Sequence, residues 1–207
     1  MAVITISRQF GAGGTTLGAR LAKRLGYRYV GDELIREVAE KVGVSLAQVR
    51  TFEKMGTSKV MRLLDWVVSP DFIERHTSSH KQLDESRYVE EVKAVILKLY
   101  EQGNAVIIGR GGNYTLKGYP NTIHVLLVAD MKHRINFLSE RYQMTQAQAE
   151  RAIKRADMIR NRFLNCFSDQ ASHDDPLLYT VTLNMDSITM DKAEDLIVSL
   201  IPEVEKD

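Results

Sequence analysis

The sequence lacks several features that define other classes of protein. It has a single cysteine, Cys166, among 207 residues, which excludes an internal disulfide framework and a multi-cysteine metal site and favours a reducing compartment. The N-terminal apolar run is too short for a signal peptide, and no stretch has the length of a membrane span. The 28 basic residues nearly balance the 27 acidic ones, so overall charge indicates neither nucleic acid nor a membrane as a partner. We therefore expect a soluble cytoplasmic protein.

The chain also lacks a proline-rich linker, an internal repeat and a low-complexity tract, so we expect one domain over residues 1–207. Apolar runs typical of strands alternate with amphipathic helical patterns. The predicted strands are 3–6, 27–30, 105–108, 123–129 and 178–183, and the main later helices are 32–42, 88–102, 131–143 and 191–201. This alternation predicts an α/β fold with a five-stranded parallel sheet covered by helices on both faces. Right-handed crossovers then bring the carboxyl ends of the strands to one edge.

A glycine-rich turn between the first strand and the first helix has the layout of a phosphate-binding loop. Glycines let the backbone curl until successive N–H groups point inward, and the helix N-terminus adds partial positive charge. The candidate donor-phosphate ligands are Gly11, Ala12, Gly13, Gly14, Thr15 and Thr16. The Thr15 or Thr16 hydroxyl can also bind magnesium. The alternative is an ordinary turn of an α/β protein.

The usual lysine of such a loop is missing. In the pattern G-x-x-x-x-G-K-[ST], Gly13 matches the second glycine, Arg8 stands at the first, and Gly14 replaces the lysine. An active enzyme needs that positive charge from elsewhere. The Arg8 guanidinium can fold over the turn and supply it. The alternative is a structural ion pair between Arg8 and a carboxylate such as Asp32.

Two further strand ends carry candidate ligands for an acceptor. Asp32 follows the second strand, at the edge where open α/β sheets bind ligands, and it is a candidate for the acceptor or for a magnesium-bound water. A plain helix N-cap is the alternative role for Asp32. Arg110 follows the buried strand 105–108 inside a second glycine turn, which makes it a candidate acceptor-phosphate ligand.

A late helix, opened by a capping box at Thr145 to Gln148, carries many basic residues. They are Arg151, Lys154, Arg155, Arg160 and Arg162. Clustered arginines suit phosphoryl transfer, which needs positioning and positive charge around the moving group. The alternative is a solvated helix face with pairs such as Glu150–Lys154, and Asp157 can serve Arg160 or Lys154. His76 and His80 lie among turn-forming residues, which favours a solvated loop over a metal site.

These motifs together resemble the cytidylate-kinase-like family of P-loop proteins. The resemblance rests on the stretches Ser7 to Gly14, Gly31 to Ile35, Ile107 to Tyr114, Arg155 to Arg162 and Tyr179 to Asp186. It implies a nucleoside monophosphate kinase fold with a core at 1–44, 86–144 and 170–207, a helical acceptor-binding insert at about 45–85 and an arginine-bearing lid at about 145–169.

The resemblance also implies roles for individual residues. The loop from Gly11 to Thr16 would hold ATP with magnesium, and Arg110 would hold the acceptor phosphate. Arg155 would lie near the acceptor ribose, with Arg160 and Arg162 near the transferring phosphates. We therefore assign catalytic roles to Arg8 and these three lid arginines, and magnesium contacts to Thr15 and Asp32.

Several positions depart from the family pattern. The third strand of cytidylate kinases ends D-G-R-D, but Ile108 and Gly111 stand at the two aspartate places. By this resemblance, Ile108 removes a carboxylate that would help to bind magnesium, and Gly111 removes a carboxylate that would help to read the base. Ile159 replaces an acidic lid residue that touches the ribose. The leading hypothesis is ATP-dependent phosphoryl transfer to a nucleoside monophosphate, CMP first. The rivals are a nucleotide-binding sensor or partner-binding module without turnover and a kinase of another small metabolite. The oligomeric state stays open.

Overall fold

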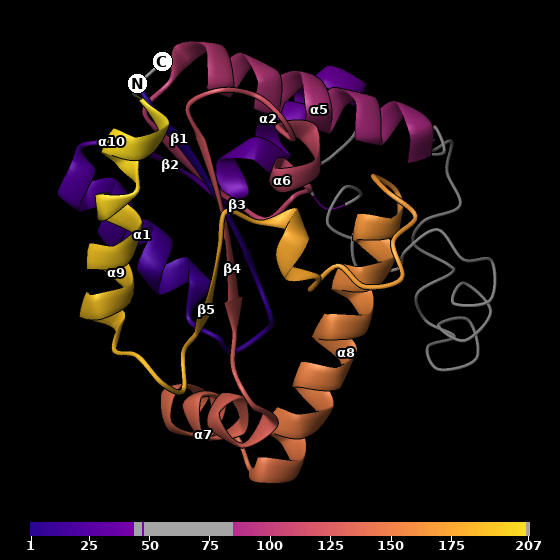
Figure 1. Cartoon of the computed structure of the whole chain (residues 1–207). Coiled ribbons are helices and arrows are strands. Elements are labelled where there is room, and N and C mark those ends of the chain that lie inside the picture. The colour runs from indigo at the N-terminus through magenta and orange to yellow at the C-terminus, as the bar shows by residue number, and fades with distance from the viewer. Residues whose placement is uncertain (44–46, 48–84, 206–207) are drawn as a thin grey trace, which may run out of the picture.

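The computed structural model describes residues 1–43, 47 and 85–205. Its centre is one five-stranded sheet, all of whose strands run parallel in the order β2-β3-β1-β4-β5 (Figure 1). The strands are β1 (Val3–Arg8), β2 (Arg28–Val30), β3 (Ala105–Ile108), β4 (Thr122–Val128) and β5 (Val181–Asn184). The predicted α/β fold with a five-stranded parallel sheet is confirmed.

Helices cover both faces of the sheet (Figure 1). The longer ones are α1 (Gly14–Leu25), α2 (Asp32–Val42), α5 (Glu85–Gln102), α7 (Met131–Tyr142), α8 (Gln146–Asn165) and α9 (Met190–Ser199). Short turns form α6 (Gly112–Thr115), the 3₁₀ helix η2 (Pro176–Leu178) and α10 (Ile201–Val204). Within the described parts of the chain, no helix is long and apolar enough to cross a membrane.

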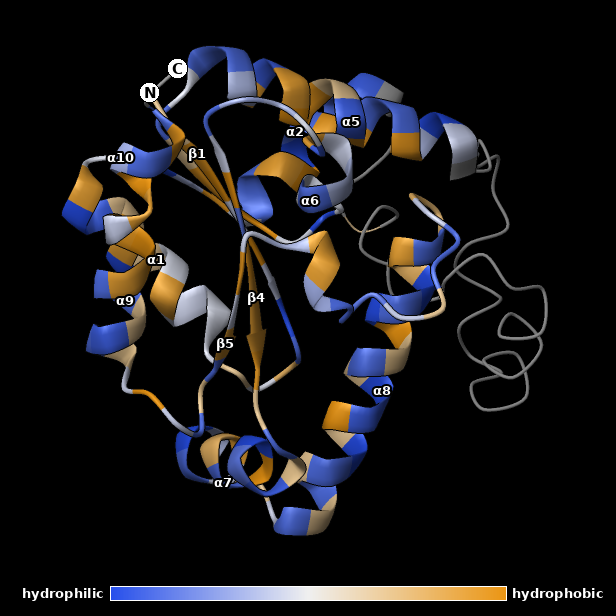
Figure 2. Cartoon of the chain, viewed as in Figure 1, coloured by the Kyte–Doolittle hydropathy of each residue, from blue (hydrophilic) through white to orange (hydrophobic). Residues whose placement is uncertain are grey.

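Alternate residues of each central strand enter different cores. Val3 and Ile107 pack with α2 and α5, whereas Ile4 and Ile108 pack with α1 and α9. Because successive side chains of a strand point to opposite faces, a strand buried on both sides must be apolar at nearly every position. Figure 2 shows this apolar colouring along β1 and β4, and hydrophilic colouring on the outer faces of the helices.

The helices α7 and α8 form a layer of their own at the carboxyl edge of the sheet. They enclose a small separate core of Leu138, Ala149 and Ile153. The predicted capping box opens α8: the Thr145 hydroxyl accepts from the Gln148 backbone amide, and the Gln148 side chain accepts from the Thr145 amide. The basic helix is therefore held at its N-terminal end, while its later turns lie beside the strand ends.

One predicted strand boundary and one alternative role were wrong. The last strand begins at Val181 and not at residue 178, because Pro176 opens a 3₁₀ turn whose Leu177 amide donates to the Asp175 side chain. Asp32 is not the N-cap of α2, since Gly31 takes that position without a side-chain cap and Asp32 is the first helical residue. A carboxylate there still interacts favourably with the helix dipole. Almost all of the predicted acceptor-binding insert, including His76 and His80, lies outside the described residues.

Candidate functional site

The Arg8 side chain fills the space that the missing loop lysine leaves. Arg8 ends β1, and its Cγ would lie 2.8 Å from a Cβ atom at position 14. Its Nη1 would lie closer still to a Cβ atom at Gly109. Glycine is therefore required at both positions for the arginine to lie between them. The Gly14 that breaks the motif makes room for another positive charge.

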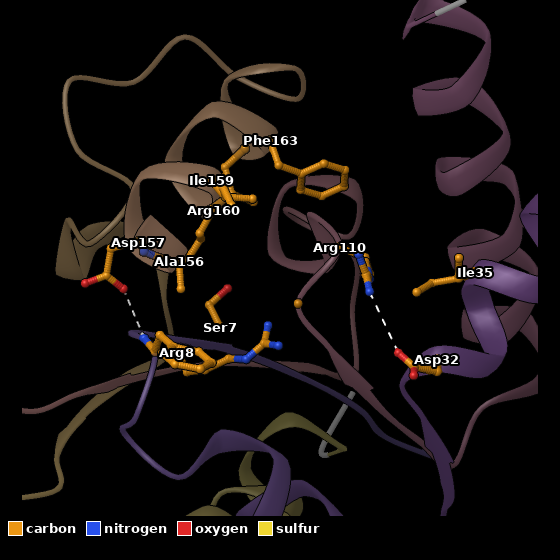
Figure 3. Close-up of a pocket in the computed structure, with 13 residues that line it drawn as sticks. Ser7, Arg8, Asp32, Ile35, Arg110, Ala156, Asp157, Ile159, Arg160 and Phe163 are labelled. Carbon is orange, nitrogen blue, oxygen red and sulfur yellow. Dashed lines mark hydrogen bonds and ion pairs between the residues drawn. The ribbon is translucent and has the colours of Figure 1, made fainter. Parts of the chain in front are cut away.

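The Arg8 guanidinium lies among other cations and not beside a carboxylate. Burial, followed by the neighbouring charges of Arg110 and Arg160, lowers the pKa of Arg8 to about 10. The proposed Arg8–Asp32 ion pair is not formed, and Arg8 has no ion pair elsewhere in the described residues. Asp32 instead lies 4.0 Å from Arg110, between Oδ1 and Nη2 (Figure 3). Arg8 is still protonated at neutral pH, which leaves its charge available to an anion.

A cavity of about 540 Å³ brings four of the predicted site residues together (Figure 3). Arg8, Arg110, Arg160 and Asp32 line it, from β1, the β3–α6 turn, α8 and the start of α2. Its apolar wall includes Ile35, Ile159 and Phe163. Three guanidinium groups around one cavity suit a ligand that carries a phosphate.

A second, smaller cavity of about 170 Å³ lies over the glycine loop. Gly11, Gly13, Gly14, Thr15 and Thr16 line it, whereas Ala12 is buried beneath. The helix α7 forms its other side with Phe137, Arg141 and Tyr142. Sequence reasoning placed Arg141 on this helix without a role. Its place beside the glycine loop could have been expected, because α7 follows β4 and the carboxyl end of β4 lies at the same edge of the sheet as the loop.

The glycine loop has the backbone that an anion site requires. Gly11 and Gly13 have φ angles of 91° and 86°, in the left-handed region. Gly13 is the N-cap of α1 and forms no side-chain hydrogen bond. The first backbone amides of that helix therefore have no side-chain cap from this residue and can donate to an anion. Gly11 is pressed by α7, because a Cβ there would lie 3.1 Å from that of Arg134.

Two aspartates that sequence reasoning left without a site role tie α8 and the following loop to the glycine loop. Asp157 accepts from the Phe10 amide at 3.1 Å and from Nη1 of the buried Arg134 at 2.6 Å. It therefore does not form the ion pair with Arg160 or Lys154 that the sequence suggested. Asp174 accepts from Arg160 Nη1 at 2.7 Å and from the Gln9 side chain at 2.9 Å. Their partners lie far away in sequence, so no local pattern could reveal these roles.

A buried histidine anchors the loop that carries Asp174. Its ring nitrogens lie 2.6 Å from the Tyr114 hydroxyl and 2.6 Å from the Asn165 side-chain oxygen, and its carbonyl accepts from Tyr179. Burial first, and then Arg160, lowers the pKa of this residue, His173. Burial also raises the pKa of Tyr114 to about 12. Both groups are neutral at physiological pH, so the anchor adds no charge near Arg160.

Other predicted site residues lie apart. Arg155 is exposed on α8 and lines neither cavity. Arg162 also lines neither, and its Nη1 is buried without a hydrogen-bond partner among the described residues. The predicted exposed pair Glu150–Lys154 is confirmed at 2.6 Å.

The residues suggested for magnesium are divided between the cavities. Thr15 lines the smaller one and Asp32 the larger one. Ile108, at an aspartate place of the family pattern, packs on α1, where its Cδ1 excludes any side chain at Gly18. No group of three or more histidine, cysteine or acidic side chains suited to a metal occurs in the described ranges. The Thr15 hydroxyl fits an ion whose other ligands come from nucleotide phosphates and water.

A parallel sheet with a glycine loop after β1, and arginines gathered at its carboxyl edge, defines a protein of the P-loop kinase fold. The family model described as the cytidylate kinase-like family matches residues 3–187, and the chain belongs to that family. The suspected resemblance is confirmed. Membership supports nucleotide-dependent phosphoryl transfer as the general class of activity. No curated protein sequence matches the chain.

Several solved structures are similar to the chain at low sequence identity, and the first of them shows the same fold. An uncharacterized protein from Eubacterium ventriosum ATCC 27560 is 20% identical, with a TM-score of 0.69 over 98% of this chain and 99% of that one. A shikimate kinase from Acinetobacter baumannii in complex with shikimate is 16% identical, with a TM-score of 0.48 over 100% and 96%. A gluconokinase from Sinorhizobium meliloti 1021 is 12% identical, with a TM-score of 0.47 over 98% and 94%.

Proposed function

We propose that the protein transfers the γ-phosphoryl group of ATP to a small phosphorylated acceptor, a nucleoside monophosphate with CMP as the first candidate. The observation that carries this proposal is the position of Arg8, which lines both cavities. A cation between a donor cavity and an acceptor cavity lies where charge moves during phosphoryl transfer. The smaller cavity is then the donor site and the larger one the acceptor site.

In the donor site, the amides of the glycine loop hold the ATP phosphates, and Arg8 supplies the charge that the lysine gives elsewhere. Thr15 would hold the magnesium ion of the nucleotide, which neutralises phosphate charge when bound. Asp32, in the other cavity, is assigned to the acceptor or to a water of that ion. The exposed Arg141 beside the loop adds positive charge at the same site.

In the acceptor site, Arg110 and Arg160 bind the acceptor phosphate and the transferring group. Asp174 holds Nη1 of Arg160, while Nη2 of the same guanidinium is buried without a hydrogen-bond partner among the described residues. A buried donor without a partner costs free energy that a bound anion recovers. We further propose that residues 145–169 act as a lid that excludes water during transfer.

A nucleotide-binding module without turnover is the second candidate. It is favoured by Ile108, which leaves the end of β3 without a magnesium carboxylate. A kinase of another small metabolite is favoured by Gly111, which leaves the acceptor site without a carboxylate to read a base. The three arginines that line one cavity suit a phosphorylated ligand, and turnover decides between the proposal and the binding module.

A phosphotransfer panel tests the proposal. Purified protein with ATP and magnesium is given each common nucleoside monophosphate and several small metabolites, and ADP is measured. We expect acceptor-dependent ADP, with CMP among the substrates. Arg110→Ala should raise the KM of the acceptor strongly and leave ATP affinity near normal. Arg151→Ala is the matched control, because Arg151 is exposed on α8 and lines neither cavity. Binding of ATP without turnover of any acceptor would favour the second candidate.

A further inference from the structure

The place where a base-reading carboxylate is expected is filled by an aromatic ring. Gly111 has a φ angle of 70°, and a Cβ atom there would lie 2.6 Å from Cδ1 and 2.7 Å from Cε1 of Phe167. The Phe167 ring is packed, so its atoms cannot move away from such a Cβ atom as the end of a flexible side chain could. No side chain fits at position 111 while Phe167 stays where it is, so this corner of the site cannot offer a hydrogen-bonding group from that position.

The same ring helps to fix a second phenylalanine that lines the acceptor site. The Phe163 ring centroid lies 5.3 Å from that of Phe167 and 6.3 Å from that of the fully buried Tyr88, which meets it edge to face. Figure 3 shows the Phe163 ring reaching from α8 toward Arg110 across the cavity. A ring held by two aromatic neighbours loses little conformational entropy on binding, so it is a preorganised contact.

The described lining beside Phe163 is mostly apolar. Ile35 and Ile159 continue the apolar wall on either side. The carboxylate of Asp157 is engaged by Arg134 and the Phe10 amide, and that of Asp32 faces Arg110. The positive charge of the cavity comes from guanidinium groups, which suit a phosphate and not a particular base.

We infer that Phe163 is the specificity-determining residue of the acceptor site and that the acceptor is a monophosphate with a flat aromatic body, held by stacking. Stacking on an aromatic side chain tolerates every base, because each base has a π-face. The site therefore takes nucleoside monophosphates with weak discrimination between bases. This inference rests on the proposed function. It differs in that the site would select any acceptor with an aromatic ring and not cytosine in particular.

The test compares acceptors that differ only in the ring. Binding is measured by calorimetry, and kcat/KM by ADP release, for CMP, UMP, AMP, GMP and ribose 5-phosphate, which has no base. We expect the four nucleotides to agree within about ten-fold and each to exceed ribose 5-phosphate by about ten-fold or more. Phe163→Leu should lower the affinity for all four by about ten-fold, through KM and not kcat, and leave ribose 5-phosphate unchanged. Phe163→Tyr, which keeps the ring, should retain the preference for the nucleotides over ribose 5-phosphate that Phe163→Leu loses.

The outcomes separate this inference from the function on which it rests. A preference of more than about a hundred-fold for one base would overturn the inference and leave the kinase proposal intact. Two further results would also overturn the inference and leave the kinase proposal intact. One is a kcat/KM for ribose 5-phosphate equal to that for the nucleotides, and the other is a loss of activity in Phe163→Leu that is confined to kcat. ADP release with none of these acceptors would overturn the proposed function, and the calorimetric comparison of the five ligands would still decide whether Phe163 selects a ring.

Discussion

At the scale of single residues, the Arg8 side chain occupies the space beside position 14, where the usual motif has a lysine. Arg8 approaches from the end of β1, whereas the usual lysine approaches from the first turn of the helix. The two solutions exclude one another in space, because a Cβ at Gly14 would lie 2.8 Å from Arg8 Cγ. Restoring the standard motif by one substitution therefore damages the site.

The first prediction concerns this pair. Gly14→Lys alone should lower thermal stability and ATP affinity, since its side chain meets Arg8. Arg8→Ala should slow turnover by about a hundred-fold or more, which is typical for a lost electrostatic group. The double variant Arg8→Ala/Gly14→Lys should recover part of that rate. Steady-state kinetics with a folding check by circular dichroism measure all three. A native rate for Arg8→Ala would remove Arg8 from the mechanism.

The second prediction is that Arg8 costs stability. Burial lowers the pKa of Arg8 to about 10, well below the ordinary value of arginine, so the folded state disfavours the charged form. Arg8→Met removes the enclosed charge and should raise the free energy of unfolding by about 1–3 kcal/mol while turnover is lost. The cost is complete below about pH 10 and declines as pH rises from about 10 toward the ordinary pKa of arginine, because the unfolded chain then binds more protons than the folded one. Urea unfolding at pH 8 and pH 10.5 should show the gap narrowing. A less stable methionine variant contradicts this.

At the scale of elements, α8 is joined to the glycine loop through charged contacts, while Phe163 in its last turns packs against Tyr88 of the main core. Its own core with α7 is small, and its carboxylate Asp157 joins the Phe10 amide to Arg134. Elements with few buried apolar contacts open at low free energy. Polar contacts thus hold the first part of α8 at the sheet edge, and we propose that this part moves as the lid.

The third prediction tests that attachment. Asp157→Asn leaves only one oxygen for two donors, so amide hydrogens of α8 should exchange about ten-fold faster, while those of β1 and β4 stay protected. Addition of ATP and acceptor should slow the exchange of residues 146–165 in the native protein. Glu150→Gln is the control, since its carboxylate pairs only on the exposed face. Equal exchange of α8 in all forms would show that Asp157 does not hold the helix.

At the scale of the whole molecule, much of the fold is predictable and much of the site is not. Apolar runs such as Ala105–Ile108 are buried on both faces, and their alternation with amphipathic helices indicates a parallel sheet. The contact of Arg8 with Gly109 and that of Phe167 with Gly111 join residues far apart in sequence. From the sequence alone, Arg155 and Arg160 are equally good candidates for the site, because both lie on the same basic helix. Of the two, only Arg160 forms an ion pair with an aspartate of the following loop, Asp174.

The fourth prediction follows from the charge gathered at the sheet edge. Arg8, Arg110 and Arg160 repel one another, so a polyanion that bridges them should stabilise the folded chain. Pyrophosphate at about a hundred times its Kd should add about 2.7 kcal/mol, or about 5–10 °C in melting temperature. Arg8→Met should reduce this gain, and Arg151→Ala should not. Differential scanning fluorimetry measures the shifts. An equal gain in native protein and Arg8→Met would place the anion elsewhere.

The way Arg8 lies between two glycines has a consequence for ancestry. A lineage that carried a lysine at position 14 could not acquire this arginine without a clash, and one that lost the lysine first would lack the charge. Mutations at positions 8, 14 and 109 are therefore epistatic, and their order of appearance is constrained. Among descendants that keep the arginine, we expect glycine at both other positions to be inherited with it as a block.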